Sequence, residues 1–229
     1  MHPALALALA YISGSLPFAW LAGKASGVDL RTQGSGNLGA TNVFRVLGWK
    51  IGVAVFLADA LKGALPVLLL PRHIDSSLDP TFWAIVCGVA AIAGHVRPVF
   101  LKFRKGGKGV ATAAGVFFAL APVPMLVTFA VFVAVVLATG YVSLGSLLSA
   151  IVLPALLVAM QGPRAPLFIV SLVVATFVFW THRANIGRLR RGDEHRFGKG
   201  GRRLQFVTLA LALGMIGLLA ALAHLRGLV

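Results

Sequence analysis

Residues 110–139 read VATAAGVFFALAPVPMLVTFAVFVAVVLAT, a long apolar stretch with prolines at positions 122 and 124. A membrane-spanning helix needs about 20 apolar residues, so this stretch is long for one span and short for two. Proline inside a helix removes a backbone hydrogen bond and bends or ends the helix. The number of times that the chain crosses a membrane therefore depends on whether these prolines divide the stretch.

The rest of the chain is also dominated by apolar runs. Hydrophobic residues make up 59% of the 229, charged residues make up 12%, and the mean hydropathy is +0.92. A soluble domain has roughly a quarter of its residues charged. Further runs of about the length of a span cover residues 3–23, 50–71, 82–101, 142–160, 165–182 and 205–223. The composition predicts an all-α, polytopic membrane helical bundle and disfavours a soluble helical bundle. No soluble domain is expected.

Charge patterning sets the expected topology. The formal net charge is +15, and most of the Lys and Arg residues fall in the stretches 24–50, 97–108 and 183–203. Basic loops of membrane proteins face the cytoplasm. The chain must then cross the membrane an even number of times between the second and third stretches. Residues 110–139 should therefore divide at the prolines into segments of about 110–121 and 125–139, one of them short or re-entrant.

This topology gives a seven-segment core with the N-terminus outside. The core occupies residues 1–204, and residues 205–229 carry an additional C-terminal transmembrane helix. The first apolar run lacks the basic start and the small-residue cleavage site of a signal peptide, so we expect it to remain as the first span. Interfacial tryptophans are typical of span ends, and all four fall there: Trp20, Trp49, Trp83 and Trp180. Cys87, the single cysteine, is interpreted as a packing residue.

Residues 34–42, GSGNLGATN (the first loop), begin with the G-x-G-x-x-G pattern of dinucleotide sites. That pattern works between a buried strand and a helix, whereas here a short polar stretch precedes it and a membrane span follows. We interpret the loop as an anion site, because glycines admit an anion close to the backbone and N–H groups at a helix start point at it. An ordinary turn is the alternative. The candidate groups are Ser35, Gly36, Asn37, Thr41, Asn42 and, just beyond the loop, Arg45.

Residues 103–112, FRKGGKGVAT (the second loop), repeat this chemistry around Lys108. The stretch is not a Walker A loop, because Gly109 stands where Ser or Thr would follow the lysine. A Gly-Gly-Lys-Gly turn that leads into a helix N-terminus can still hold phosphate oxygens, so Gly106, Gly107 and Gly109 are candidate binding residues. Cytoplasmic basic charge with flexible glycines is the alternative.

Residues 179–198, FWTHRANIGRLRRGDEHRFG (the third stretch), place His182 and Asn185 on one helical face at the end of a span. A histidine satisfied at the membrane interface is the alternative to a site. Ser143, in the turn between the fifth and sixth segments, should face the same side and could donate to the same anion. Asp59 and Lys62 lie three residues apart inside a span, where they could neutralise each other or serve a function.

Together the three stretches resemble the bacterial acyl-phosphate:glycerol-3-phosphate acyltransferases of the small integral-membrane type. The first motif is similar to Ser35-Gly36-Asn37-x-Gly39-Ala40-Thr41-Asn42-x-x-Arg45. The second is similar to Gly94-His95-x-x-Pro98-x-Phe100 followed by Gly106-Gly107-Lys108-Gly109-Val110-Ala111-Thr112. The third is similar to His182-Arg183-x-Asn185-Ile186-x-Arg188-Leu189-x-x-Gly192-x-Glu194. The resemblance covers residues 1 to about 200.

The resemblance implies transfer of a fatty acyl group from acyl phosphate to the 1-hydroxyl of glycerol 3-phosphate, which gives lysophosphatidic acid and phosphate. It implies a multi-pass protein of the bacterial inner membrane with a cytoplasmic active site, without a metal or other cofactor and without use of acyl-CoA. No nucleic acid and no obligate protein partner are expected. By position, the catalytic residues would be Ser35, Lys108, His182 and Asn185. The substrate-binding residues would be Gly36, Asn37, Thr41, Asn42, Arg45, Gly106, Gly107, Gly109 and Ser143.

Two other classes of protein could use a basic membrane chain of this kind. A transporter of phosphate or organic anions would need charges along a path through the membrane, whereas the polar motifs here gather on one predicted face. A lipid phosphotransferase would need clustered Asp residues to hold a metal ion, and the sequence lacks such a cluster.

Overall fold

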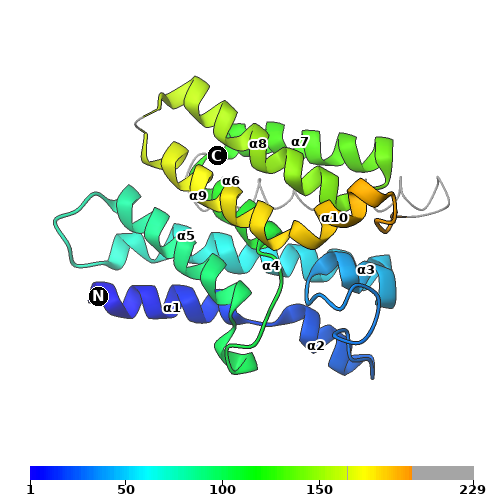
Figure 1. The fold of residues 1–229 in the computed structure, drawn as a ribbon. Helices are drawn as coiled ribbons and strands as arrows, with labels where there is room; N and C mark the ends of the chain where they lie inside the picture. Colours follow the sequence, from blue (N-terminus) through cyan, green and yellow to red (C-terminus); the bar gives the residue numbers. More distant parts are fainter. Residues whose placement is uncertain (164, 198–229) are drawn as a thin grey trace. The chain divides into compact units, whose positions relative to one another are not determined.

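The computed structural model describes residues 1–163 and 165–197, and every element in these residues is a helix. The described chain forms two compact units, residues 1–120 and residues 121–197 (Figure 1). Among the described residues, five helical segments are long and apolar enough to cross a membrane: Pro3–Ala25, Trp49–His73, Pro80–Leu101, Pro122–Thr139 and Val142–Gln161. A sixth is added if the bent pair Pro166–Thr181 and Arg183–Arg191 is one span. The expected all-α membrane fold is confirmed. The helix predicted at 205–223 lies outside the described residues.

The first unit contains two long helices, α4 and α5, four shorter helices and two short 3-10 helices. Its elements are α1 (Pro3–Ser15), α2 (Phe18–Ala25), α3 (Ala40–Leu47), α4 (Trp49–Leu69), η1 (Pro71–His73), α5 (Pro80–Val96), η2 (Val99–Leu101) and α6 (Val110–Leu120). Helix α1 packs along α5, and α4 packs along α6 (Figure 1). The apolar runs at 3–23, 50–71 and 82–101 therefore correspond to helical regions close to the expected bounds.

Small residues let these helices approach backbone to backbone. A Cβ added at Gly63 of α4 would overlap the backbone of α6 at Thr112, and one added at Gly115 of α6 would overlap the backbone of α4 at Ala60. A Cβ added at Gly14 of α1 would overlap the backbone of α5 at Ala91. Lipid supplies no hydrophobic drive for helices to associate, so close packing of small residues is the usual means of joining membrane helices. The helix pairs of the first unit are joined in this way.

The first apolar run is broken, which the sequence analysis did not anticipate. Helix α1 ends at Ser15, α2 begins at Phe18, and Pro17 stands between them. The Lys62 ammonium donates to the Leu16 carbonyl at 2.6 Å, and the Ser13 hydroxyl donates to the Lys62 carbonyl at 2.9 Å. A buried lysine from α4 therefore satisfies a backbone group at the break.

The apolar stretch 110–139 divides at its prolines, as predicted. Helix α6 ends at Leu120, and α7 (Pro122–Thr139) begins two residues later. The second helix starts earlier than the expected residue 125, because Pro122 and Pro124 lie in its first turn, where proline is tolerated. Helix α6 has 11 residues, most of them buried. At 1.5 Å per residue it is about half the length of a span, so it matches the short segment that the charge pattern required.

The second unit consists of α7, α8 (Val142–Gln161), α9 (Pro166–Thr181) and α10 (Arg183–Arg191). Helix α8 packs against both α7 and α9. Helices α9 and α10 meet at a bend of 57° centred on His182, so His182 and Asn185 do not share one continuous helix as predicted. Ser143 lies in the first turn of α8 and not in the preceding turn.

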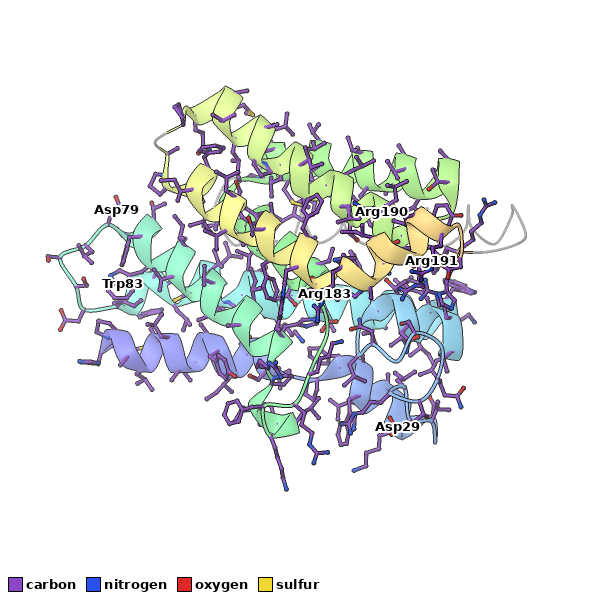
Figure 2. All side chains as sticks on the ribbon, viewed as in Figure 1. Asp29, Asp79, Trp83, Arg183, Arg190 and Arg191 are labelled. Atoms are coloured by element: carbon purple, nitrogen blue, oxygen red, sulfur yellow. The ribbon has the colours of Figure 1, made fainter. Side chains whose placement is uncertain are left out.

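Basic side chains stack on three of the four tryptophans. Lys24 lies over Trp20, Lys50 over Trp49 and Arg183 over Trp180, with the charge 5.0–5.9 Å from the ring centroid. Figure 2 shows Arg183, Arg190 and Arg191 along α10, and Asp79 and Trp83 at the start of α5. The three stacked pairs all lie at span ends that the topology assigns to the cytoplasm, whereas Trp83 packs edge-on against Phe82.

The division of 110–139 can be tested by cysteine labelling in a Cys87→Ala background. We expect Gln161→Cys and Ser76→Cys to react with a membrane-impermeant maleimide on intact spheroplasts, because the topology places both exposed positions outside. Thr32→Cys should react only after permeabilisation. If residues 110–139 crossed once, Gln161→Cys alone would change sides, and this result would refute the topology.

Candidate active site

The first loop is closed by the side chain of Asn42. Its amide oxygen accepts from the Ser35 N–H at 2.8 Å and from the Ser35 hydroxyl at 3.1 Å, and its amide nitrogen donates to the carbonyls of Leu30 and Gln33, both at 3.0 Å. Asn42 is 1% exposed. The Asn42 side chain therefore holds the conformation of the first loop. A contact between this side chain and a substrate stays a prediction.

The other candidates of the first loop are more accessible than Asn42. Ser35 and Gly36 are exposed, and Asn37, Thr41 and Arg45 are half-buried. Gly36 has φ +67°, in the left-handed region that favours glycine, and Asn42 holds the neighbouring Ser35 in place. The loop therefore presents Ser35 on a fixed backbone beside the N-terminus of α3.

The second loop rests on His95 of α5. A Cβ added to Gly107 would overlap His95 Nε2 and would lie 2.8 Å from the Leu38 carbonyl oxygen, and one added to Gly106 would overlap the His95 carbonyl. The Gly106 N–H donates to the Val96 carbonyl at 2.9 Å. Because Leu38 belongs to the first loop, the structure brings the two predicted anion loops together within the first unit.

Residues 107–109 lead directly into α6, as the sequence predicted. Gly106, Gly107 and Gly109 are buried, and Lys108 is half-buried. Gly109 has φ +83°, and its carbonyl accepts from the Ala113 N–H at 2.8 Å, which starts the helix. A lysine and a helix N-terminus therefore occur together, a combination suited to a phosphate group.

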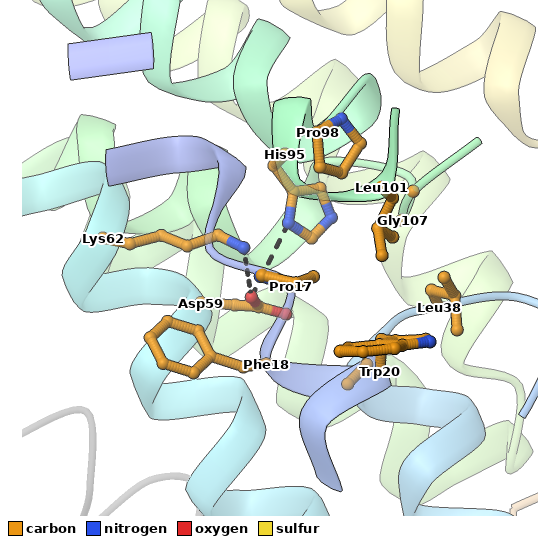
Figure 3. A pocket seen from close by; sticks show the side chains of 12 residues that line it. Pro17, Phe18, Trp20, Leu38, Asp59, Lys62, His95, Pro98, Leu101 and Gly107 are labelled. Atoms are coloured by element: carbon orange, nitrogen blue, oxygen red, sulfur yellow. Dashed lines mark ion pairs between the residues drawn. The ribbon is translucent and has the colours of Figure 1, made fainter. Parts of the chain in front are cut away.

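A pocket is lined by Leu38 of the first loop, by Gly106 and Gly107 of the second loop and by residues 17–20 at the α1–α2 break (Figure 3). Three charged or titratable side chains, Asp59, Lys62 and His95, also line it. Asp59 Oδ1 is 2.6 Å from Lys62 Nζ and 3.6 Å from His95 Nδ1. Asp59 and Lys62 therefore form the ion pair that their spacing allowed. We call Asp59, Lys62 and His95 the buried cluster. Sequence reasoning noted His95 only as part of a motif, and its contact with Asp59 depends on the packing of α4 against α5.

In the second unit, Glu194 connects two of the remaining candidates, Ser143 and Asn185. Its Oε1 accepts from the Ser143 hydroxyl at 2.9 Å and from the Asn185 amide at 2.7 Å, and its Oε2 pairs with Arg188 Nε at 2.6 Å. Gly192, with φ +76°, ends α10 and turns the chain back so that Glu194 reaches these partners. Sequence reasoning did not assign Glu194 to the site. The available signal was a carboxylate within a strongly basic stretch.

The ionisation of Glu194 is favoured by its partners. Burial acts to raise the pKa of Glu194, but hydrogen bonds from Asn185, Arg188 and Ser143, together with the charge of Arg188, outweigh burial and hold the pKa below its ordinary value. His182 is 3% exposed, and its Nδ1 lies 2.8 Å from the Val178 carbonyl. A carbonyl only accepts, so this nitrogen carries a proton.

These features are those of an integral membrane protein in which two glycine-rich loops of the first unit contact each other at Leu38 and Gly107. The sequence model of the family "Glycerol-3-phosphate acyltransferase" matches residues 4–192. The chain belongs to the glycerol-3-phosphate acyltransferase family.

Individual relatives agree with this assignment. The protein named glycerol-3-phosphate acyltransferase in Geobacter sulfurreducens is 49% identical over 191 residues, which cover 83% of this chain and 95% of the relative. That of Geotalea daltonii is 47% identical over 188 residues, or 82% and 94% of the two chains.

Solved structures of the integral membrane glycerol 3-phosphate acyltransferase PlsY (YgiH) have the same fold. Its glycerol 3-phosphate form is 42% identical with a TM-score of 0.78, and the match covers 86% of this chain and 96% of that one. Its lysophosphatidic acid form is 40% identical with a TM-score of 0.77, covering 89% and 98%. These relatives are named as acyltransferases, and none of those described supports the transporter alternative.

The contribution of Glu194 to stability can be measured by comparing Glu194→Ala with Asp193→Ala. Loss of Glu194 leaves Ser143, Asn185 and Arg188 without their shared acceptor, which should cost about 1–3 kcal/mol and lower the thermal unfolding midpoint. Asp193 is more than half exposed and pairs only with Arg191 in the described chain, so its loss should change little.

This contribution should also depend on pH with a definite sign. Because the folded pKa of Glu194 is lowered, the stabilisation is complete above the unfolded pKa of about 4 and is lost as the pH falls through the folded value. The difference between wild type and Glu194→Ala should therefore be full at neutral pH and shrink in acid. Equal midpoints for the two variants at pH 7 would contradict the assigned role.

Proposed function

We propose that the protein transfers a fatty acyl group from acyl phosphate to the 1-hydroxyl of glycerol 3-phosphate and releases lysophosphatidic acid and inorganic phosphate. This reaction is the first acylation of phospholipid synthesis. Membership of the glycerol-3-phosphate acyltransferase family over residues 4–192 is the observation that carries the proposal. Phosphate as the common group of both substrates suits the two loops that meet at Leu38 and Gly107.

The chemistry needs no acyl-enzyme. The hydroxyl oxygen of glycerol 3-phosphate attacks the acyl carbonyl carbon and forms the new ester bond, while the bond from that carbon to the phosphate oxygen breaks. The hydroxyl proton passes to an oxygen of the leaving phosphate. Catalysis then comes from positioning the two substrates and from donors around the developing oxyanion.

The predicted residues divide between positioning and charge stabilisation. Both substrates are anions, and a chain of net charge +15 attracts them. Lys108 and Arg45 supply positive charge, and the N–H groups of the glycine turn and Ser35 supply neutral donors. His182, with Nδ1 protonated, orients glycerol 3-phosphate or assists its proton transfer through Nε2. Asn185 is assigned to catalysis with it, and Ser143 to substrate binding.

We assign this activity to the cytoplasmic side of the bacterial inner membrane, with the N-terminus outside. The support is the placement of basic residues: Lys24, Lys50 and Arg183 stack on tryptophans at predicted inner span ends. The proposed acyltransferase domain is residues 1–204, and the further span that the sequence predicts within 205–229 lies outside the described residues.

The donor can be identified with purified protein in detergent. Glycerol 3-phosphate should be converted to lysophosphatidic acid when acyl phosphate is added, and not when acyl-CoA of the same chain length is added. Release of one inorganic phosphate per ester formed checks the balance of the reaction. Product from acyl-CoA alone would refute the donor assignment, and product from neither donor would refute the enzyme assignment.

The role of Lys108 can be separated from bulk charge by comparing Lys108→Ala with Lys105→Ala. Both variants lose one positive charge from the second loop, but Lys105 is exposed and Lys108 is half-buried beside the glycine turn. We expect Lys108→Ala to lower kcat/KM for glycerol 3-phosphate by about a hundredfold and Lys105→Ala by no more than about twofold. Similar losses in both variants would show that only the overall charge of the loop matters.

A further inference from the structure

We infer that the buried cluster of Asp59, Lys62 and His95 positions the second loop for phosphate binding, with His95 as the residue that touches the loop. The inference rests on the proposed function, because it concerns how that site is held. It assigns to three membrane-buried polar residues a role that ion pairing alone does not explain.

The cluster is fully inside the first unit. Asp59, Lys62 and His95 are 2%, 3% and 5% exposed. Burying charges is costly, and a buried ion pair can often be replaced by apolar residues without loss of stability. If the pair only filled space between α4 and α5, apolar side chains would do so equally well. A further task for the charges is therefore expected.

The task is indicated by what each member touches. Lys62 donates to the Leu16 carbonyl at the α1–α2 break and pairs with Asp59. The carboxylate of Asp59 in turn faces Nδ1 of His95 at 3.6 Å, slightly longer than a hydrogen bond. A carboxylate at this position favours the ring orientation and tautomer in which Nδ1 carries the proton. The opposite nitrogen, Nε2, then points at Gly107 (Figure 3).

The imidazole of His95 limits where the backbone of the glycine turn, Gly106 and Gly107, can lie. Gly107 lies so close to His95 Nε2 that a Cβ would overlap it, and Leu38 of the first loop borders the same position. Gly106 is tied to the same helix end through the Val96 carbonyl. A tilt of the ring would therefore move the Gly106–Gly107 backbone, the Lys108 that follows it, and the contact between the two loops. Asp59 holds the ring against such a tilt.

Two double variants separate this role from ion pairing. Asp59→Asn with Lys62→Met keeps a carbonyl oxygen that can accept from His95 Nδ1, whereas Asp59→Leu with Lys62→Met removes the acceptor. Both variants are uncharged at the pair and both lose the Lys62 contact with Leu16, so they differ only in the residue 59 side chain, which can accept a hydrogen bond in the first variant and not in the second. Cys87→Ala, a buried change on the same face of α5 two turns away, is the control for packing.

We expect the Leu-containing variant to have a KM for glycerol 3-phosphate roughly tenfold or more above that of the Asn-containing variant, with a smaller difference in kcat. Cys87→Ala should match wild type. Stabilisation of each variant against heat by glycerol 3-phosphate gives a second measure of binding that does not require turnover. Equal KM values and equal heat stabilisation in the two folded double variants would overturn the inference.

Failure of folding and failure of the proposed function can both be recognised. If a double variant does not fold, His95→Leu replaces it, because this side chain is of comparable size and has no polar atom to face Asp59. A raised KM then supports the inference, and an unchanged KM refutes it. If wild type neither forms product nor is stabilised by glycerol 3-phosphate, the proposed function has failed. If only the positioning role is wrong, the wild type is still active, and the two double variants have the same KM for glycerol 3-phosphate.

Discussion

At the break between α1 and α2, the Leu16 carbonyl accepts from the Phe18 N–H at 3.1 Å, and the buried ammonium of Lys62 is its second donor at 2.6 Å. This contact of a buried charge with the break begins a series of contacts through the first unit. A buried ammonium needs a counter-ion, which is Asp59, and the carboxylate of Asp59 faces His95. His95 lies under the glycine turn, where the second loop meets Leu38 of the first. The break at Pro17 and the arrangement of the loops therefore depend on the same three side chains.

Each of the two units contains one buried carboxylate. Of the six Asp and Glu residues, Asp59 and Glu194 are buried, and Asp29, Asp75, Asp79 and Asp193 are exposed. Asp59 connects Lys62 of α4 with His95 of α5, while Glu194 connects Ser143 at the start of α8 with Asn185 and Arg188 of α10. Each carboxylate is thus used to fix functional loops or helix ends, and the chain retains a large positive excess. That excess is what anionic substrates require.

The sequence predicted features that depend on local pattern, and it missed those that depend on packing between distant elements. Apolar runs and prolines placed the helices and the division at Ala121, and the three-residue spacing of Asp59 and Lys62 predicted their pairing. The α1–α2 break was missed because Pro17 sits inside an otherwise continuous apolar run, where proline can also merely kink a helix. The His95 and Glu194 contacts join residues that only the packed helices bring together. The hydrogen bonds by which the Asn42 amide closes its own loop likewise depend on the folded chain, and its predicted contact with a substrate stays a prediction.

Rigid support for the loops follows from the kind of reaction proposed. When phosphate is the leaving group and can itself take the proton, the protein need not supply a nucleophile, and rate enhancement depends on where substrates and donors are held. Backbone N–H groups in a glycine turn are suitable donors only if the turn is fixed, since glycine by itself is conformationally free. In this protein, contacts of Gly107 with the His95 ring and with the Leu38 carbonyl restrict the conformational freedom of the turn. Under the proposed reaction, the buried cluster would therefore act on the chemistry through the shape of the loops.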